Sequence, residues 1–594
     1  MKLSALAFAL AAPLVALLPA AAYAAETSGR PDSIAAVVAD YEAYDRRVDP
    51  IGAGRSGDRE ALSRLPDDSP AAVAQNRREL EALHTRLAAL PSSPLAGEDA
   101  LNRELLAREV DDQLQVIALD ADRIDFDSYS GFHLLLSEVA QGTAIRDAAD
   151  ARAWIARLRA APRFYEIETA NARRGVATGF TQPRPTVEAV LAVAGRQADA
   201  APADSEAMAP FKALPASIPP DQAAALRAEA LQVVTGLVQP AQRRLVTFLE
   251  TEYLPHARAS LAARDLPNGA AYYAWLVRRD TTTELTPDQI HAIGLSEVKR
   301  IRGEMEALIA STGFKGTFQD FQRRLRTDPQ FYVTTPEALL QRSALFDKET
   351  DAALPRFFAT LPRLPFTVKP IPAESAEGAT TAYYEGGSPQ LGLAGTYRVN
   401  TTHLDQRPLY ELPALSLHES APGHHVQIAL AQERTDLPRF RRDAYLVAFA
   451  EGWALYAEHL GVEMGRYKTP EENFGRLSYE MWRACRLVAD TGIHWLRWSR
   501  EQARACFVEN TALTPKNIEV ELDRYISWPG QALGYKIGEL KIRALRARAE
   551  TALGPRFDVR RFHDAVLLEG ALPLTVLERR IDAWIAAEQA RPAT

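Results

Sequence analysis

Residues 418–425 read His-Glu-Ser-Ala-Pro-Gly-His-His and begin like the signature of a zinc peptidase. In its common form that signature places two His at positions i and i+4 of one helix, with a Glu beside the first His as general base. The opening His-Glu pair is present, but Pro422 occupies the position of the second His. The remaining candidates for the second metal ligand are His424 and His425.

A regular helix would exclude both candidates. A spacing of six residues turns His424 by about 240° away from His418, and a spacing of seven places His425 about 10.5 Å further along the axis. Two ligands of one ion each lie only about 2 Å from it. Pro removes a backbone donor and Gly tolerates unusual backbone angles, so the Pro-Gly pair predicts a bulge that returns His424 to the metal. We favour His424 as the second ligand and keep His425 as the alternative.

The motif is also compatible with a surface helix end, where His side chains interact favourably with the helix dipole. The next expected helix, over residues 443–465, favours the metal site. Its first half is apolar on every side and is expected to be buried, yet it contains Glu451. A buried carboxylate is costly unless it is paired or metal-bound. We expect Glu451 to be the third ligand, with a buried salt bridge to an Arg as the alternative.

Glu458 lies two turns beyond Glu451 on the same face, and we expect it to orient a ligand His. Its alternative role is that of an ordinary polar residue, because the helix becomes polar there. Glu419, the partner of His418 in the motif, is the expected general base.

Further candidates for the site follow in the C-terminal part. Arg486, Asp490 and His494 recur at four-residue steps and share one helix face. We expect Asp490 to hold one tautomer of His494, and either His494 or Tyr535 to donate to the oxyanion formed during hydrolysis. A structural polar ladder between helices is the alternative for the first three, and ordinary packing is the alternative for Tyr535.

Contacts to a substrate are expected from cations and from a strand. Residues 397–401 predict an edge strand beside a cleft, to which an extended peptide could pair; a structural hairpin strand is the alternative. A substrate carboxylate could be held by a guanidinium or ammonium group, and the alternative for each is packing or surface charge. The candidate substrate contacts are Tyr397, Asn400, Arg486, Arg524 and Lys536.

The rest of the chain predicts a mainly helical protein with one small sheet before the motif. Apolar residues recur at three- and four-residue steps over 70–89, 97–118, 147–160, 220–254, 286–311, 317–326 and 335–361. Alternating β-branched and aromatic residues predict strands over 364–370, 380–384 and 396–402. The expected regions are a signal peptide (1–24), an N-terminal helical region (25–195), a linker or loop rich in Ala, Pro, Asp and Ser (196–222), and a helical catalytic region (223–594) with the sheet at about 364–402 and the zinc site at 418–458.

The N-terminus reads as a cleavable signal peptide. Lys2 precedes an apolar run over 3–21, and residues 22–24 read Ala-Tyr-Ala, a small-x-small cleavage pattern. A membrane anchor is the alternative, since about 20 apolar residues can span a bilayer, but two Pro interrupt the run. We expect cleavage after Ala24, a periplasmic or secreted protein and no stable membrane anchor.

Composition excludes some classes of function. The formal net charge of −8 over 594 residues argues against nucleic acid as a partner. Cys485 and Cys506 are the two Cys of the chain, too few for a Cys-based metal site. They predict either a disulfide, which an oxidising compartment permits, or two buried thiols.

Four blocks in combination resemble the bacterial domain-of-unknown-function family 885. They lie at 418–425, 451–456, 486–494 and 525–538, and the resemblance covers nearly all of the mature chain. That family is similar to the gluzincins, helical zinc peptidases with two His and one Glu as ligands. Its plan resembles that of helical carboxypeptidases and oligopeptidases with a deep central cleft, which is the fold expected here.

We therefore expect a zinc-dependent peptidase of short peptides, carboxypeptidase- or oligopeptidase-like. Zn²⁺ held by His418, His424 and Glu451 would activate a water, and Glu419 would take its proton. One alternative is a zinc hydrolase of esters or non-peptide amides. The other is a non-catalytic periplasmic binding protein with a structural or vestigial metal site, against which the intact general base argues.

Overall fold

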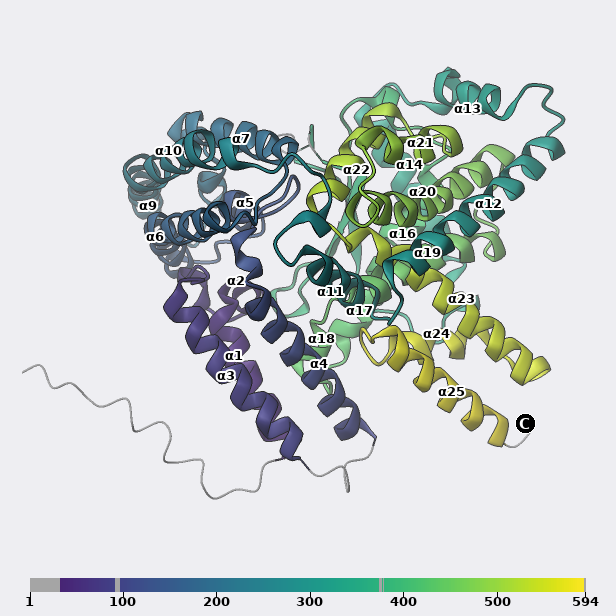
Figure 1. Ribbon diagram of the computed structural model, residues 1–594, viewed down its shortest axis with the longest axis horizontal. Coiled ribbons are helices and arrows are strands. Elements are labelled where there is room, and N and C mark those ends of the chain that lie inside the picture. Colours follow the sequence, from purple (N-terminus) through teal and green to yellow (C-terminus); the bar gives the residue numbers. More distant parts are fainter. Residues whose placement is uncertain (1–32, 91–96, 373–375, 378, 592–594) are drawn as a thin grey trace, which may run out of the picture.

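In the computed structural model, which describes residues 33–90, 97–372, 376–377 and 379–591, helices form almost all regular structure (Figure 1). Within these ranges one three-stranded sheet accompanies them. The predicted fold class, mainly helical with a small sheet before the metal-binding motif, is confirmed. The predicted signal peptide lies outside the described residues, and the deep cleft stays a prediction.

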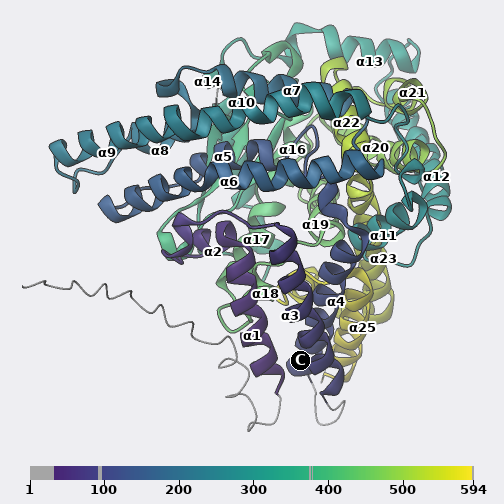
Figure 2. The same ribbon diagram turned by 60° about the vertical axis from the view of Figure 1, so that its left-hand side comes forward.

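The N-terminal half consists of two groups of helices. The first holds α1, α3 and α4 together with the short α2. The second holds α6, α7, α9 and α10; in Figure 2 α9 and α10 follow one another along one line, and α6 runs beside them. Their bounds are α1 Ile34–Val48, α2 Pro50–Arg55, α3 Pro70–Ala89, α4 Glu98–Leu119, α5 Phe132–Gln141, α6 Ala148–Thr178, α7 Arg184–Asp199, α8 Ala209–Lys212, α9 Pro220–Val233 and α10 Gln239–Phe248.

The predicted linker is part of the N-terminal core. Met208 and Phe211 are buried in the same apolar cluster as Trp154 of α6 and Leu245 of α10, and this cluster extends to Tyr253. Helices α9 and α10 pack on α6 and α7. The apolar core of the N-terminal half therefore extends past residue 195 to Tyr253, and the start of the catalytic region at 223 stays a prediction. Apolar side chains, although few in this Ala- and Pro-rich segment, suffice to anchor it.

The C-terminal half surrounds α20, in which every residue from Phe474 to His494 is buried. Cys485 of α20 and Cys506 of α21 form a disulfide. The bounds here are α11 Gly269–Thr281, α12 Pro287–Ser311, α13 Phe318–Thr327, α14 Pro336–Asp351, α16 Leu412–Glu419, α17 His424–Glu433, α18 Arg439–Arg442, α19 Val447–Glu463, α20 Pro470–His494, α21 Arg500–Asn510, α22 Pro515–Ser527, α23 Gly534–Leu553, α24 Val559–Leu567 and α25 Leu574–Ala590. Among the described residues, no helix combines the length and the apolar character needed to cross a membrane.

The sheet has the strand order β1-β3-β2, formed by β1 (Phe366–Pro370), β2 (Ala382–Glu385) and β3 (Gly395–Val399). β3 pairs in parallel with β1 and antiparallel with β2. The prediction of an edge strand at 397–401 is wrong, because β3 is central. Both sides of its backbone are occupied by neighbouring strands, so a substrate peptide cannot pair with it.

Two helices that carry site residues, α19 and α23, approach closely through glycines. A Cβ on Gly452 of α19 would lie 2.5 Å from the Cα of Gly538 of α23. A Cβ on Gly538 would overlap the carbonyl oxygen of Ala448. One turn earlier in α23, a Cβ on Gly534 would lie 2.7 Å from Val447 Cγ1. The absence of side chains at these positions sets the depth at which α19 lies in the core.

We predict that Gly538→Ala destabilises the protein, because its methyl group must push α23 away from α19. Overpacking of this kind costs about 1–3 kcal/mol, which a thermal unfolding experiment detects as a lower melting temperature. Gly303→Ala in α12 is the matched control, since a Cβ there meets no atom within 4 Å. It is expected to stabilise by about 0.5–1 kcal/mol. Equal melting temperatures for the two variants would contradict the role of the glycine contact.

Candidate metal centre

The motif forms a break between two helices. α16 ends at Glu419, and α17 begins at His424. The turn between them contains a cis peptide bond before Pro422. Gly423 packs so tightly that a Cβ would overlap the carbonyl oxygen of His418. The predicted bulge within one helix is thus corrected to a full stop and restart, which brings His424 beside His418 as expected.

A hydrogen bond holds this turn against α19. The indole N–H of Trp453 donates to the carbonyl oxygen of Pro422 at 2.9 Å, and Trp453 is fully buried. The rings of His418 and His424 then lie 4.9 Å apart at 88° to each other. Their Nε2 atoms face the carboxylate of Glu451 on α19.

His418, His424 and Glu451 together form a buried group able to hold a metal ion. Glu451 Oε2 lies 3.3 Å from His418 Nε2 and 3.4 Å from His424 Nε2, and all three ligating atoms lie within 4.8 Å of one another. Ligands about 2.1 Å from a tetrahedral zinc are about 3.4 Å apart. Within the described ranges this is the one cluster of at least three His, Cys, Asp or Glu side chains with such geometry.

The charges and the unpartnered carboxylate oxygen of this group favour the binding of a cation. Glu451 Oε2 is buried and has no hydrogen-bond partner among the described residues. Burial lowers the pKa of His418, but Glu451 and Glu458 outweigh it and raise that pKa to about 9. Burial likewise raises the pKa of Glu451, yet His424 and His418 hold it well below its usual value. The group therefore attracts positive charge, and a divalent ion can replace the protons.

Two further side chains orient the ligands. Glu458 Oε1 accepts a hydrogen bond from His418 Nδ1 at 2.8 Å, as predicted, and Arg483 Nη2 lies 3.0 Å from the same oxygen. This bond turns Nε2 of His418 towards Glu451. The hydroxyl of Tyr445 donates to Glu451 Oε1 at 2.6 Å. Sequence reasoning missed Tyr445, which lies in the segment before α19 and has no periodic signal of its own.

Glu419, the expected general base, lies at the end of α16 and is 8% exposed. It interacts electrostatically with His418. Among the described residues, none donates a hydrogen bond to its carboxylate. Its carboxylate therefore lies beside a candidate ligand without a hydrogen-bond donor from these residues.

Tyr535 lies beside the ligands, whereas His494 and Asp490 have structural roles. The ring of Tyr535 is parallel to that of His418, with centroids 6.4 Å apart. Both nitrogens of His494 are occupied, Nδ1 by the backbone N–H of Ala263 at 3.2 Å and Nε2 by the carbonyl of Tyr525 at 2.7 Å. No N–H remains for an oxyanion, which corrects the expected role of His494.

Asp490 does not hold His494. It accepts hydrogen bonds from the hydroxyl of Tyr273 at 2.6 Å and from the backbone N–H of Gly530. Burial raises its pKa to about 7. The predicted pairing of Asp490 with His494 is therefore wrong, and Asp490 fixes the turn before α23 instead.

Of the three candidate cations, Arg524 has the most exposed side chain, at 12% against 2% for Arg486 and 0% for Lys536. Lys536 is fully buried and bonded to three carboxylates, of Glu297, Glu480 and Glu539, at 2.8–3.1 Å. Arg486 is buried and donates to Glu521 and to the hydroxyl of Tyr525. Both are thus part of the core rather than a substrate site. Arg524 donates to neutral oxygens, those of Gln531 at 2.7 Å and Tyr535 at 3.0 Å.

The remaining candidates are engaged by other groups of the protein. His425 Nδ1 is 2.9 Å from the hydroxyl of Tyr384, and burial lowers the pKa of His425 to about 4. Tyr397 is fully buried with its hydroxyl 3.3 Å from Ser416 Oγ. Asn400 is buried and donates to backbone carbonyls, including that of Ala376 at 2.7 Å. None of the three has a polar atom free for a substrate.

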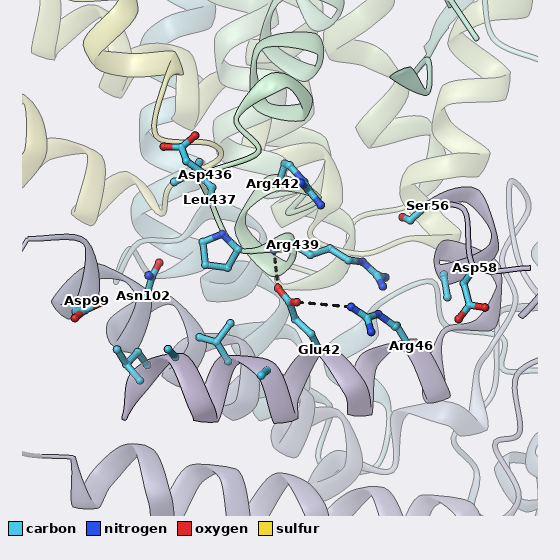
Figure 3. Close-up of a pocket in the computed structure, with 16 residues that line it drawn as sticks. Glu42, Arg46, Ser56, Asp58, Asp99, Asn102, Asp436, Leu437, Arg439 and Arg442 are labelled. Carbon is cyan, nitrogen blue, oxygen red and sulfur yellow. Dashed lines mark hydrogen bonds and ion pairs between the residues drawn. The ribbon is translucent and has the colours of Figure 1, made fainter. Parts of the chain in front are cut away.

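A cavity of about 700 Å³ lies elsewhere, between α1, α2 and the segment that leads into α18. In Figure 3 Glu42 points into it, between Arg46 and Arg439. Glu42 accepts a hydrogen bond from the backbone N–H of Arg439 at 2.6 Å and lies 4.0 Å from Arg46. No ligand of the metal group lines this cavity.

Comparison with known proteins finds one matching family and several similar solved structures. The family described as "Bacterial protein of unknown function (DUF885)" matches residues 50–581. No curated protein matches the chain. The structure described as "The crystal structure of the putative lipoprotein from Colwellia psychrerythraea" is similar with a TM-score of 0.85 and 29% identity, over 93% of this chain and 99% of that one. A second, "a putative lipoprotein of unknown function from Shewanella oneidensis", has a TM-score of 0.70 and 17% identity, over 92% and 99%, and shows the fold alone.

We predict that His424→Ala abolishes stoichiometric zinc binding, whereas His425→Ala retains it. The first variant removes a metal ligand. Its loss of zinc affinity should therefore exceed the roughly 10- to 100-fold loss that is typical when a residue hydrogen-bonded to a ligand is removed. Zinc per protein, measured by mass spectrometry after dialysis against a competing chelator, distinguishes the two. Loss of zinc in His425→Ala alone would reverse the assignment.

We also predict that Glu458→Gln weakens zinc binding by roughly 10- to 100-fold, because the amide cannot fix the tautomer of His418 as a carboxylate does. A zinc titration with a fluorescent competitor measures the change. Glu463→Gln, at the exposed end of the same helix, is the control and should bind zinc like the wild type.

Proposed function

Since this chain belongs to DUF885, a family of bacterial proteins of unknown function, we propose a function from the metal centre itself: an exported, zinc-dependent peptidase that hydrolyses short peptides. One observation carries the proposal. The buried group of His418, His424 and Glu451 lies beside Glu419, a carboxylate that no described residue engages by a hydrogen bond.

The donor set favours zinc and a catalytic site. Two imidazoles and one carboxylate suit Zn²⁺, and three protein ligands leave a fourth position open, as in catalytic rather than structural zinc sites. A zinc ion held there would acidify a water and polarise a substrate carbonyl. We assign the gluzincin-like arrangement on this basis.

The protein residues then have distinct tasks. Glu419 takes the proton of the attacking water and later gives it to the leaving amine. Tyr535 accepts its hydrogen bond from Arg524, so the phenolic proton is free to be donated to the developing oxyanion. Glu458 and Tyr445 keep the ligands His418 and Glu451 in place.

An extracytoplasmic location fits the same proposal. The 29% identical solved structure is described as that of a "putative lipoprotein", and the Cys485–Cys506 disulfide is of a kind that persists in oxidising compartments. Both observations support export, in agreement with the signal peptide expected at the N-terminus.

We predict that Glu419→Gln retains stoichiometric zinc but loses hydrolysis by about 10²- to 10⁴-fold, because the amide cannot accept the proton of water. The measurement is kcat/KM on a peptide library, with cleavage products identified by mass spectrometry. Glu463→Gln serves as the control, since its side chain is 41% exposed and paired with Arg546.

A panel of peptides, esters and non-peptide amides separates the alternatives. Turnover of esters or amides without peptide cleavage would replace the peptidase assignment by another zinc hydrolase. Full zinc loading with no turnover of any class would favour a binding protein. Near wild-type turnover by Glu419→Gln would exclude this residue as the general base.

A further inference from the structure

We infer that the metal centre acts at the C-terminal end of its substrates, and that Arg524 binds their free terminal carboxylate. This inference rests on the proposed peptidase function and names its substrate class. It follows from a surplus of buried positive charge next to the metal ligands.

Two guanidinium groups share one carboxylate there. Glu521 Oε2 lies 2.8 Å from Arg486 Nη2 and also accepts from the hydroxyl of Tyr525 at 2.7 Å. Arg524 Nη1 is 3.7 Å from the other oxygen of Glu521, too far for a hydrogen bond. Arg524 Nε has no hydrogen-bond partner among the described residues. Glu521 is thus shared by two guanidinium groups, and Arg524 has no hydrogen-bonded carboxylate of its own.

Asp127 is a second carboxylate that interacts electrostatically with Arg524, but it does not serve as the missing counter-ion. Asp127 accepts hydrogen bonds from the backbone N–H groups of Tyr129 and Ser130 and from the hydroxyl of Ser130. It is occupied by its own loop. A cation with little solvent contact and no dedicated counter-ion is costly, and a substrate anion would supply the missing partner.

The surroundings of Arg524 suit the end of a peptide. Its side chain is 12% exposed, in contrast to fully buried Lys536. The guanidinium carbon lies 5.5–5.9 Å from the ring centres of Tyr129, Trp528 and Tyr535. Tyr129 is 37% exposed, so the cation lies at the base of an aromatic surface that reaches solvent. Aromatic walls of this kind accept apolar side chains and strengthen a charge-assisted hydrogen bond by excluding water.

Tyr535 connects this cation to the metal ligands. Its hydroxyl accepts from Arg524 and its ring lies parallel to that of His418. Tyr445, which is bonded to Glu451, interacts electrostatically with both Tyr535 and Arg524. The guanidinium carbon lies 5.9 Å and the His418 ring centre 6.4 Å from the ring centre of Tyr535, a reach that a few residues of extended peptide at about 3.5 Å each can span. A carboxylate on Arg524 would therefore place one of the last peptide bonds of the substrate at the metal.

A loop of the N-terminal half lies next to Arg524. The loop that carries Tyr129 is fixed to the end of α22, where the hydroxyls of Ser128 and Ser527 are 2.9 Å apart and Gln182 donates to the carbonyl of Ser527 at 3.1 Å. α22 packs against α7 at the junction of the two halves (Figure 1). This loop therefore stands next to the cation, with the ring centre of Tyr129 5.5 Å from the guanidinium carbon of Arg524.

The test uses pairs of peptides that differ only in a free or an amidated C-terminus. With the zinc-loaded, full-length wild type we expect kcat/KM to be roughly 10- to 150-fold higher for the free acid, the factor for one hydrogen bond to a charged group. Arg524→Gln should lower kcat/KM for the acid more than for the amide and bring the acid-to-amide ratio close to one, and Arg524→Lys should keep part of the preference. The ratio is the readout, because Arg524 also donates to Tyr535 and its loss affects both substrates. Arg504→Gln, a partly exposed Arg paired with Glu519, is the control and should keep all of it.

Binding gives a readout that does not depend on turnover. On the zinc-loaded Glu419→Gln background, calorimetry should find tighter binding of the free acid than of the amide, and addition of Arg524→Gln should abolish the difference. Equal affinity and equal cleavage of acid and amide by a protein whose hydrolysis depends on Glu419 would overturn this inference alone. An acid preference in binding without hydrolysis of any peptide would uphold the carboxylate site and overturn the peptidase proposal.

Discussion

The burial of one carboxylate, that of Glu451, is the constraint on which the site depends. An ionised carboxylate in the core needs compensating charge or a metal. His418 and His424 supply the compensation, and they can do so together because the chain breaks between α16 and α17. The depth of Glu451 is in turn set by the glycine contact of α19 with α23. Since α23 also carries Tyr535, the same contact places the phenol beside the ligands.

Two charge networks near the site illustrate how structural and functional cations differ. Lys536 is surrounded by Glu297, Glu480 and Glu539, and the carboxylate of Glu480 is shared further with Arg476. That network is closed and leaves no charge for a ligand. Around Glu521 the balance is reversed, because two Arg side chains compete for one acid. The availability of a cation is therefore decided by its partners rather than by its position next to a motif.

Sequence reasoning identified the metal group because ligand type, helix geometry and burial all pointed to the same residues. Glu451 stood out as an acid in an apolar helix, and His424 was preferred because Pro422-Gly423 disrupts the helix. The same reasoning failed for His494 and Lys536. Helical periodicity shows which face a side chain occupies, but not that the carbonyl of Tyr525 or three distant Glu side chains already use its polar atoms.

The predictions of the strand order and of the segment over 196–222 were limited by contacts between residues that lie far apart in the sequence. The strands were located correctly, but the central position of β3 depends on the order in which distant segments pair. The segment over 196–222 has loop composition, yet Met208 and Phe211 fix it to a core that its local sequence does not describe.

The interrupted helix has a consequence for how such sites are recognised. When two ligands lie on one helix, their separation along the chain is dictated by the helical repeat, and a fixed pattern detects them. Here each His belongs to a different helix, so the intervening turn alone determines how many residues separate them. A search that requires the spacing of one regular helix will therefore overlook centres of the same chemistry.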